Sequence, residues 1–314
     1  MKARPWPWLK ILGSLLTLGL LSLWVAQQDW ATLRTTLSRV PMPVLVAAGG
    51  LYGLGQVANA RRWYVLLRGS GLQVSWGKAL RLTFAGAFAS NFLPSTVGGD
   101  ALRVSGLSNE AVPPAAALST VMADRLLNVT AMYSFAPLTW ATYGTHLLAG
   151  TAAFTAPTRG GLQVGSSVGG ARLSRWLRAK FDEGAAVWRA LWRSPRVWGP
   201  GLGWAWVSLL LPFTATWLMA QALGIPVGWY QVAGTTVITY TLTLLPIALN
   251  GYGVREVSMT TLYTILGATP IQAIALALLT RFLMATATLP GAFWLPEAWP
   301  QSARASLDSR RETQ

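Results

Sequence analysis

Seven charged side chains lie in otherwise apolar stretches of this 314-residue chain, three of them acidic and four basic. They are Asp100, Asp124, Glu256, Arg103, Arg125, Arg255 and Arg281. A lone charge at the centre of a membrane-spanning helix costs roughly 2.5–3.5 kcal/mol on insertion scales. We therefore expect these side chains to face the protein interior, to pair with one another or to line a wet cavity. Because the arginines outnumber the acids by one, full pairing would leave one positive charge for a ligand.

Arginine is well suited to phosphate, because its planar guanidinium group holds two oxygens and keeps its charge when water is excluded. The charged residues therefore predict an anion-binding site midway through the membrane. We assign to this site all seven charged residues together with two nearby amides, Asn91 and Asn250. Glycine permits close backbone approach and tight reversal of the chain. Breaks in the surrounding helices are expected to act as hinges at Pro94, Gly98, Gly99, Pro246, Gly251 and Gly253.

The alternative interpretation is that these charges form structural salt bridges, which would hold neighbouring segments in register. Asp124 and Arg125 are adjacent, so their side chains point about 100° apart on a helix and cannot pair with each other. Each of them needs a partner elsewhere in the chain. We expect Glu256 to pair with Arg281, and Asp100 to pair with Arg125.

The composition indicates a membrane protein built from α-helices. Hydrophobic residues make up 53% of the chain and charged residues 11%, against about 25% charged in a soluble domain. The net charge is +15, but the basic residues cluster in loops beside apolar spans, as in cytoplasmic loops on anionic lipid. This pattern argues against nucleic-acid binding. The chain has no Cys and only one His, so we expect no disulfide, no multi-His metal site and no cofactor.

A stretch of the chain occurs twice, at 71–103 and again at 224–256. In each copy an arginine follows a proline by nine residues, and the apolar run before the proline is too short to cross a bilayer. The copies predict two re-entrant helical hairpins, at 80–107 and 230–266. The placement of Lys and Arg makes them start from opposite faces of the membrane. Such inverted repeats are a construction plan of transporters.

The complete prediction is one all-α membrane domain over 1–314 with both termini cytoplasmic, in the cell (plasma or inner) membrane. Six spans are expected at 9–26, 43–60, 115–134, 137–156, 200–222 and 271–295. The repeated halves cover about 43–134 and 200–295, and a C-terminal tail covers 297–314. Basic loops at 61–81 and 158–198 are expected on the cytoplasmic side. Within the second loop, residues 172–193 suit either an amphipathic surface helix or a solvated linker.

Three sequence blocks carry a resemblance to a known family. They are NFLPSTVGGDALR, ADRLL and NGYGVRE, with ARRWYVLLRGSGL upstream of them. Together they resemble the membrane region of the lysylphosphatidylglycerol synthase family, also described as flippase-like, over about 9–295. The resemblance assigns functional positions to Pro94, Gly99, Asp100, Arg103, Asp124, Arg125, Gly251, Gly253, Arg255 and Glu256. The compact region 137–156 departs from the family pattern.

In full-length members of that family, the membrane region moves an aminoacylated lipid between leaflets, and a separate soluble domain makes that lipid. This chain ends at Gln314 without such a domain, so we expect it not to be a synthase or another enzyme. The leading hypothesis is a flippase for an anionic or aminoacylated (glyco)phospholipid or a polyprenyl-linked lipid. One alternative is a scaffold that recruits a lipid-modifying enzyme through 158–198. Another is an enzyme acting on a lipid-linked phosphate through Asp100 and Asp124. The expected partners are membrane lipids, a lipid-modifying enzyme or a second copy of the chain.

Overall fold

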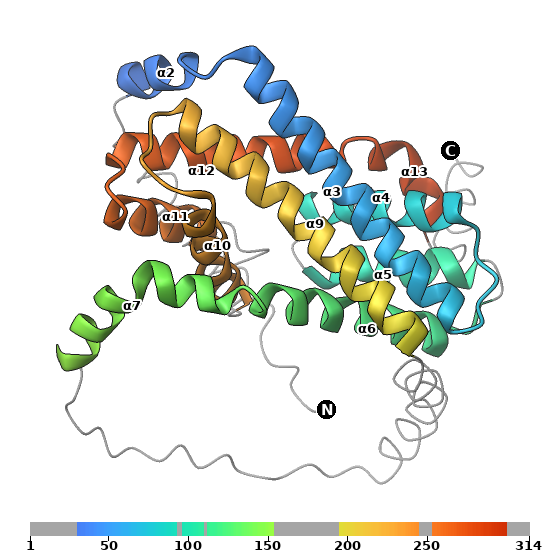
Figure 1. The fold of residues 1–314 in the computed structure, drawn as a ribbon. Coiled ribbons are helices and arrows are strands. Elements are labelled where there is room, and N and C mark those ends of the chain that lie inside the picture. Colours follow the sequence, from blue (N-terminus) through green and yellow to red (C-terminus); the bar gives the residue numbers. More distant parts are fainter. Residues whose placement is uncertain (1–29, 93–95, 110–111, 154–194, 245–252, 300–314) are drawn as a thin grey trace, which may run out of the picture.

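The computed structural model describes residues 30–92, 96–109, 112–153, 195–244 and 253–299, and every regular element within these ranges is a helix (Figure 1). The all-α expectation is therefore confirmed for this part of the chain. The helices are α2 (Trp30–Ser38), α3 (Met42–Gly69), α4 (Trp76–Phe92), α5 (Thr96–Ser108), α6 (Pro114–Tyr133), α7 (Ala136–Ala153), α9 (Pro195–Ala222), α10 (Trp229–Leu244), α11 (Val254–Ile265), α12 (Pro270–Thr288) and α13 (Gly291–Ala298).

The two longest of these helices, α3 and α9, each contain 28 residues and lie side by side across the molecule (Figure 1). Their close contact depends on small residues and proline. A Cβ added to Gly55 of α3 would lie 3.2 Å from the ring of Pro212, which sits inside α9. Because proline has no N–H, it also leaves the carbonyl four residues earlier without its usual helical donor. Around this crossing, α6 and α10–α12 complete the body of the protein.

The repeated sequence forms the same turn in both copies. Gly71 and Gly224 end the α3 and α9 segments with φ angles of 78° and 71°, a conformation in which glycine avoids the steric cost of a Cβ. The residue after each glycine donates its N–H to the carbonyl five residues earlier, from Leu72 to Leu67 and from Ile225 to Ala220. This is the hydrogen bond of a Schellman helix end. The sequence repeat is thus also a local structural repeat.

After each turn, the chain forms two short helices that contact each other: α4 with α5 in the first copy, and α10 with α11 in the second. These pairs occupy the positions predicted for the hairpins. Gly98 and Gly99 lie in the first turn of α5, so the structure does not place a break at these two predicted hinges. The hinge residues Pro94, Pro246 and Gly251 lie outside the described residues.

Glycine instead allows α4 and α5 to pack closely. A Cβ added to Gly86 of α4 would lie 2.7 Å from the carbonyl oxygen of Gly99, which is too close for any real side chain. The backbones of the two helices therefore meet at this pair of glycines. The expectation of close backbone approach is confirmed at Gly99, although the chain does not reverse there.

Two of the described helices are long and apolar enough to cross a membrane, at Val197–Ala222 and Pro270–Thr288. A third span is obtained if α2 and α3, which meet at a bend of 84°, are counted together. Large apolar side chains such as Val46, Met122 and Phe282 are exposed on the outer faces of helices, as expected for surfaces in lipid. The predicted first span and the segment 172–193 lie outside the described residues.

Two predicted boundaries are wrong. The span expected at 43–60 continues as α3 to Gly69, so Arg61, Arg62 and Arg68 belong to a helix and not to a loop. The span expected at 271–295 ends at Thr288, and α13 follows as a separate helix. In the first case the basic residues indicate a helix end, whereas buried partners such as Asp124 let the helix continue through Arg62. In the second, Pro290 stands at the start of the separate helix α13.

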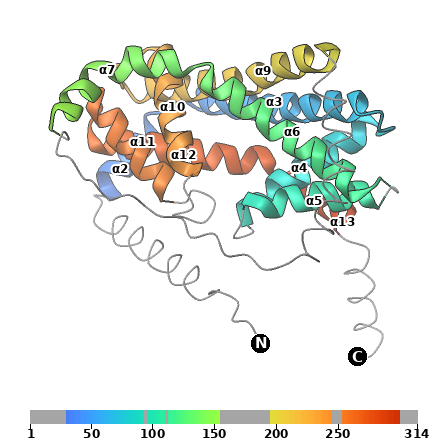
Figure 2. The same cartoon turned by 90° about the horizontal axis from the view of Figure 1, so that it is seen from below.

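The C-terminal helix α13 lies against α4 and α5 (Figure 2). Glu297 forms ion pairs with Lys78 and Arg81, with N–O distances of 3.8 and 3.4 Å. The side chain of Ser105 donates to the carbonyl of Ala298, and the amide of Asn109 donates to the Glu297 carbonyl at 3.3 Å. These contacts hold α13 against the α4–α5 pair.

Candidate functional site

Both predicted ion pairs are formed. The guanidinium of Arg125 lies 2.6 Å from Asp100, joining α6 to α5, and that of Arg281 lies 2.7 Å from Glu256, joining α12 to α11. In each pair the acid and the arginine are 25 residues apart. The two copies of the repeat therefore use the same kind of bond to hold their second short helix to the long helix that follows.

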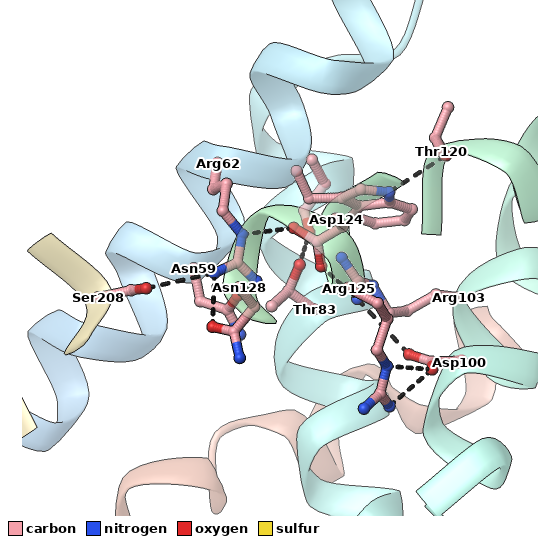
Figure 3. A network of polar contacts seen from close by, with 12 residues as sticks. Asn59, Arg62, Thr83, Asp100, Arg103, Thr120, Asp124, Arg125, Asn128 and Ser208 are labelled. Carbon is pink, nitrogen blue, oxygen red and sulfur yellow. Dashed lines mark hydrogen bonds and ion pairs between the residues drawn. The ribbon is translucent and has the colours of Figure 1, made fainter. Parts of the chain in front are cut away.

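Asp124 lies at the centre of a larger network in which it is 2% exposed (Figure 3). One carboxylate oxygen accepts from Nε of Arg62 at 2.6 Å, and the other accepts from Nη1 of Arg103 at 3.1 Å. Sequence reasoning missed Arg62, which it placed in a cytoplasmic loop. The apolar residues Trp63 and Leu66 after it continue the helical pattern, and this signal could have identified a buried arginine.

Arg62 also donates hydrogen bonds to amide and hydroxyl oxygens (Figure 3). Its guanidinium donates to Oδ1 of Asn59 at 2.5 Å, to Oδ1 of Asn128 at 2.9 Å and to Oγ of Ser208 at 3.3 Å. These partners come from α3, α6 and α9. A single buried cation thus connects three helices, and its position is fixed by four side chains including Asp124.

Arg103 is 6% exposed and stacks on an aromatic ring. Its guanidinium carbon lies 4.0 Å from the centre of the Trp63 ring, a distance at which cation–π attraction is strong. Its Nη1 also lies 3.6 Å from Asp100, so Arg103 links that residue to Asp124. Its Nε and Nη2 are buried and have no hydrogen-bond partner among the described residues.

We call these five residues, Arg62, Asp100, Arg103, Asp124 and Arg125, the charged cluster. The cluster lines a cavity of about 180 Å³ between α3, α4, α5 and α6. Its three guanidinium groups face two carboxylates, so its formal charge is +1. The cluster is therefore an ion network with one positive charge that its own acids do not balance.

A second and larger cavity, of about 300 Å³, lies among α3, α6 and α9–α12, and we call it the central cavity. Asn59 and Asn128 line both cavities, so the two adjoin at the residues that hold Arg62. The described lining of the central cavity contains one charged side chain, Arg255, and no carboxylate.

Four residues of the central cavity have buried polar atoms without a partner among the described residues. They are Nε of Arg255, the hydroxyls of Thr239 and Tyr263, and Oε1 of Gln56. The described carboxylates form no ion pair with Arg255. Leaving a buried polar group unsatisfied costs about 1–3 kcal/mol, so such groups normally bind water or a ligand. The cavity can therefore hold a polar, negatively charged group.

The remaining predicted site residues lie elsewhere. Asn91 donates to the hydroxyl of Thr288 at 2.7 Å and lies outside the described linings of both cavities. Gly253 has a φ of 82°, and its N–H donates to Glu256 at 2.8 Å at the start of α11. Asn250 is not among the described residues. Within the part of the chain that the structure describes, no three His, Asp or Glu side chains are grouped to hold a metal ion.

A family model described as "Lysylphosphatidylglycerol synthase TM region" matches residues 10–291. The matched region contains both cavities and the whole charged cluster. No curated protein matches the chain.

Proposed function

The chain belongs to the lysylphosphatidylglycerol synthase TM region family, and on that premise we propose that it moves a lipid between the two leaflets of a membrane. The substrate class is an anionic or aminoacylated (glyco)phospholipid or a polyprenyl-linked lipid. Membership of the family places the chain among membrane proteins of lipid metabolism or transport. The specific step, translocation of the head group, is our proposal.

The observation that carries this proposal is the guanidinium of Arg255 in the central cavity. It is a half-buried cation without a described carboxylate partner, its Nε is buried and has no described hydrogen-bond partner, and it lines about 300 Å³ of space together with hydroxyl and amide groups. A cation withdrawn from water in this way is costly unless an anion balances it. The phosphate of a lipid head group supplies that anion, while the acyl chains stay in the bilayer.

The repeat supports a route for the head group. The matched turns at Gly71 and Gly224 relate the two halves of the protein, and each half has an ion pair between residues 25 apart, although Asp100 and Glu256 are not at equivalent positions of the repeat. We propose that the halves have inverted topology, so that the α4–α5 and α10–α11 pairs each control access from one face. The head group would then pass the charged cluster on one side of Arg62 and the central cavity on the other. No covalent step is assigned to either site.

The test is a transport assay in proteoliposomes. An acyl-labelled fluorescent phospholipid is incorporated in both leaflets, and dithionite quenches the outer leaflet while the protein delivers the rest. Arg255→Gln should slow transport about 10- to 100-fold, because a charge-assisted hydrogen bond is worth about 1.5–3 kcal/mol. Arg34→Gln, the same change at an exposed position of α2, should leave the rate unchanged. Equal rates for all three proteins would refute the proposal.

A further inference from the structure

Each oxygen of the two acids in the charged cluster already faces an arginine. Asp124 places one oxygen on Arg62 and the other on Arg103, at 2.6 and 3.1 Å. Asp100 places one oxygen on Arg125 at 2.6 Å and the other 3.6 Å from Arg103. Every carboxylate oxygen here therefore faces a guanidinium group, and the cluster as a whole still carries a positive charge.

The acid of the second copy is engaged in the same way. One oxygen of Glu256 accepts from Arg281 at 2.7 Å, and the other accepts the N–H of Gly253 at 2.8 Å. Glu256 does not contribute to the described lining of the central cavity. The segment 245–252, which directly precedes this helix start, contains no acidic residue in the sequence. An ammonium group in the central cavity would consequently find no carboxylate from these elements.

Unlike the carboxylates, positive charges line or adjoin the central cavity. Arg255 lines the central cavity, and the +1 charge of the cluster adjoins it through Asn59 and Asn128. Both surplus charges have the same sign, and in a water-poor interior such charges act over longer distances than in solvent. They attract a phosphate and repel a head group that carries an additional fixed cation.

Hydroxyl groups dominate the rest of the polar lining. The cavity is lined by Tyr52, Ser208, Thr216, Thr235, Thr239 and Tyr263, among other residues. Tyr52 and Thr216 bond to each other at 2.9 Å, whereas the hydroxyls of Thr239 and Tyr263 have no described partner. Free hydroxyl groups match the hydroxyls of a polyol, because a hydroxyl can both donate and accept a hydrogen bond. A free amide oxygen can accept a hydrogen bond from a polyol hydroxyl.

From these observations we infer that the transported lipid has a net-anionic, hydroxyl-bearing head group without a fixed cation, of the glycerol-, inositol- or sugar-phosphate class. This inference rests on the transport function proposed above and narrows its substrate. It separates this chain from the aminoacylated lipid in the name of its family. The phosphate binds Arg255, and the polyol hydroxyls bind the unpartnered hydroxyl and amide groups of the cavity.

Two matched lipid pairs test the charge and the hydroxyl parts of the inference. Native mass spectrometry of the detergent-solubilised protein measures competition between phosphatidylglycerol and lysylphosphatidylglycerol, which differ by a cationic substituent. A second competition uses phosphatidylmethanol, which has the charge of phosphatidylglycerol but no head-group hydroxyl. The wild-type protein should prefer phosphatidylglycerol at least tenfold in the first competition and several-fold in the second. Equal or preferred binding of lysylphosphatidylglycerol would overturn the inference.

Variants assign the preference to individual groups. Arg255→Gln should remove most of the preference over lysylphosphatidylglycerol, and Arg255→Lys should retain it. Thr239→Val, which changes one hydroxyl to a methyl, should reduce only the preference over phosphatidylmethanol. Unchanged preferences in both Arg255→Gln and Thr239→Val would place the bound lipid outside the central cavity and would also overturn the inference.

The same lipids in the proteoliposome assay separate this inference from the function on which it rests. Faster transport of phosphatidylglycerol than of lysylphosphatidylglycerol supports both. Transport of both lipids at equal rates overturns the inference and leaves the transport function standing. If neither lipid moves faster than in protein-free vesicles, the transport function is refuted, and with it the claim of a transported substrate, whatever the binding competition shows.

Discussion

Replacing Asp124 by asparagine changes the charge of the cluster without changing the size of the side chain. Asp124 is 2% exposed and separates the guanidinium groups of Arg62 and Arg103. In the wild-type cluster three arginines face two acids, and in Asp124→Asn they face one. The variant therefore raises the formal charge of a buried network from +1 to +2.

The expected loss of stability follows from the burial of the pair. Removing one partner of a buried ion pair typically costs about 3–5 kcal/mol, because the other charge is left uncompensated. Asparagine keeps one carbonyl oxygen, so one of the two arginines retains an acceptor, and we expect a loss near 3 kcal/mol. That loss corresponds to a change of about 100-fold in the equilibrium constant of unfolding.

The measurement is the free energy of unfolding in mixed detergent micelles, with SDS as the denaturant and helix content as the signal. Arg125→Gln is the comparison, because it removes an ion pair to an acid of the same cluster, but its side chain is 50% exposed. An exposed pair is worth about 0–1 kcal/mol, so this variant should lose much less stability. A double variant, Asp124→Asn with Arg62→Gln, returns the formal charge to +1.

The double variant decides between two explanations. If the uncompensated charge causes the loss, the double variant should be more stable than Asp124→Asn alone, although Arg62→Gln also removes hydrogen bonds to two asparagines. A loss for Asp124→Asn no greater than that for Arg125→Gln would refute the reasoning. So would additive losses in the double variant, since additivity would mean that the two residues do not interact.

Two further predictions concern helix packing and the second copy of the repeat. Gly86→Ala should reduce the free energy of unfolding by about 1–3 kcal/mol, because its Cβ would lie 2.7 Å from a backbone carbonyl of α5. The control is Gly77→Ala in the same helix, where an added Cβ meets nothing within 4 Å. This control should be neutral or slightly stabilising in the same SDS titration. Glu256→Gln should destabilise the α11–α12 contact, because it removes the ionic partner of Arg281. Amide hydrogen exchange should then increase in α11 and not in α4. Equal exchange in wild type and variant would contradict this assignment.

The class of the protein and part of the site could be predicted from the sequence alone. Low charge and long apolar stretches require a membrane environment whatever the arrangement of the helices. The high cost of a lone charge in lipid required partners for the charged residues, and the pairs Asp100–Arg125 and Glu256–Arg281 were predicted on that ground. Both pairs join helices that follow one another in the chain.

The remaining site residues depended on contacts between distant helices. Arg62 looked like part of a basic loop, because its partners Asp124, Asn128 and Ser208 are 62 to 146 residues away in the sequence. Likewise, sequence counting left one arginine in surplus but gave no physical basis for choosing which one. Only the packed helices show that Asp124 is shared between Arg62 and Arg103, and that Arg255 faces a cavity without a described carboxylate. Hydropathy and charge are properties of each residue, whereas the choice of partner is decided by which helices touch.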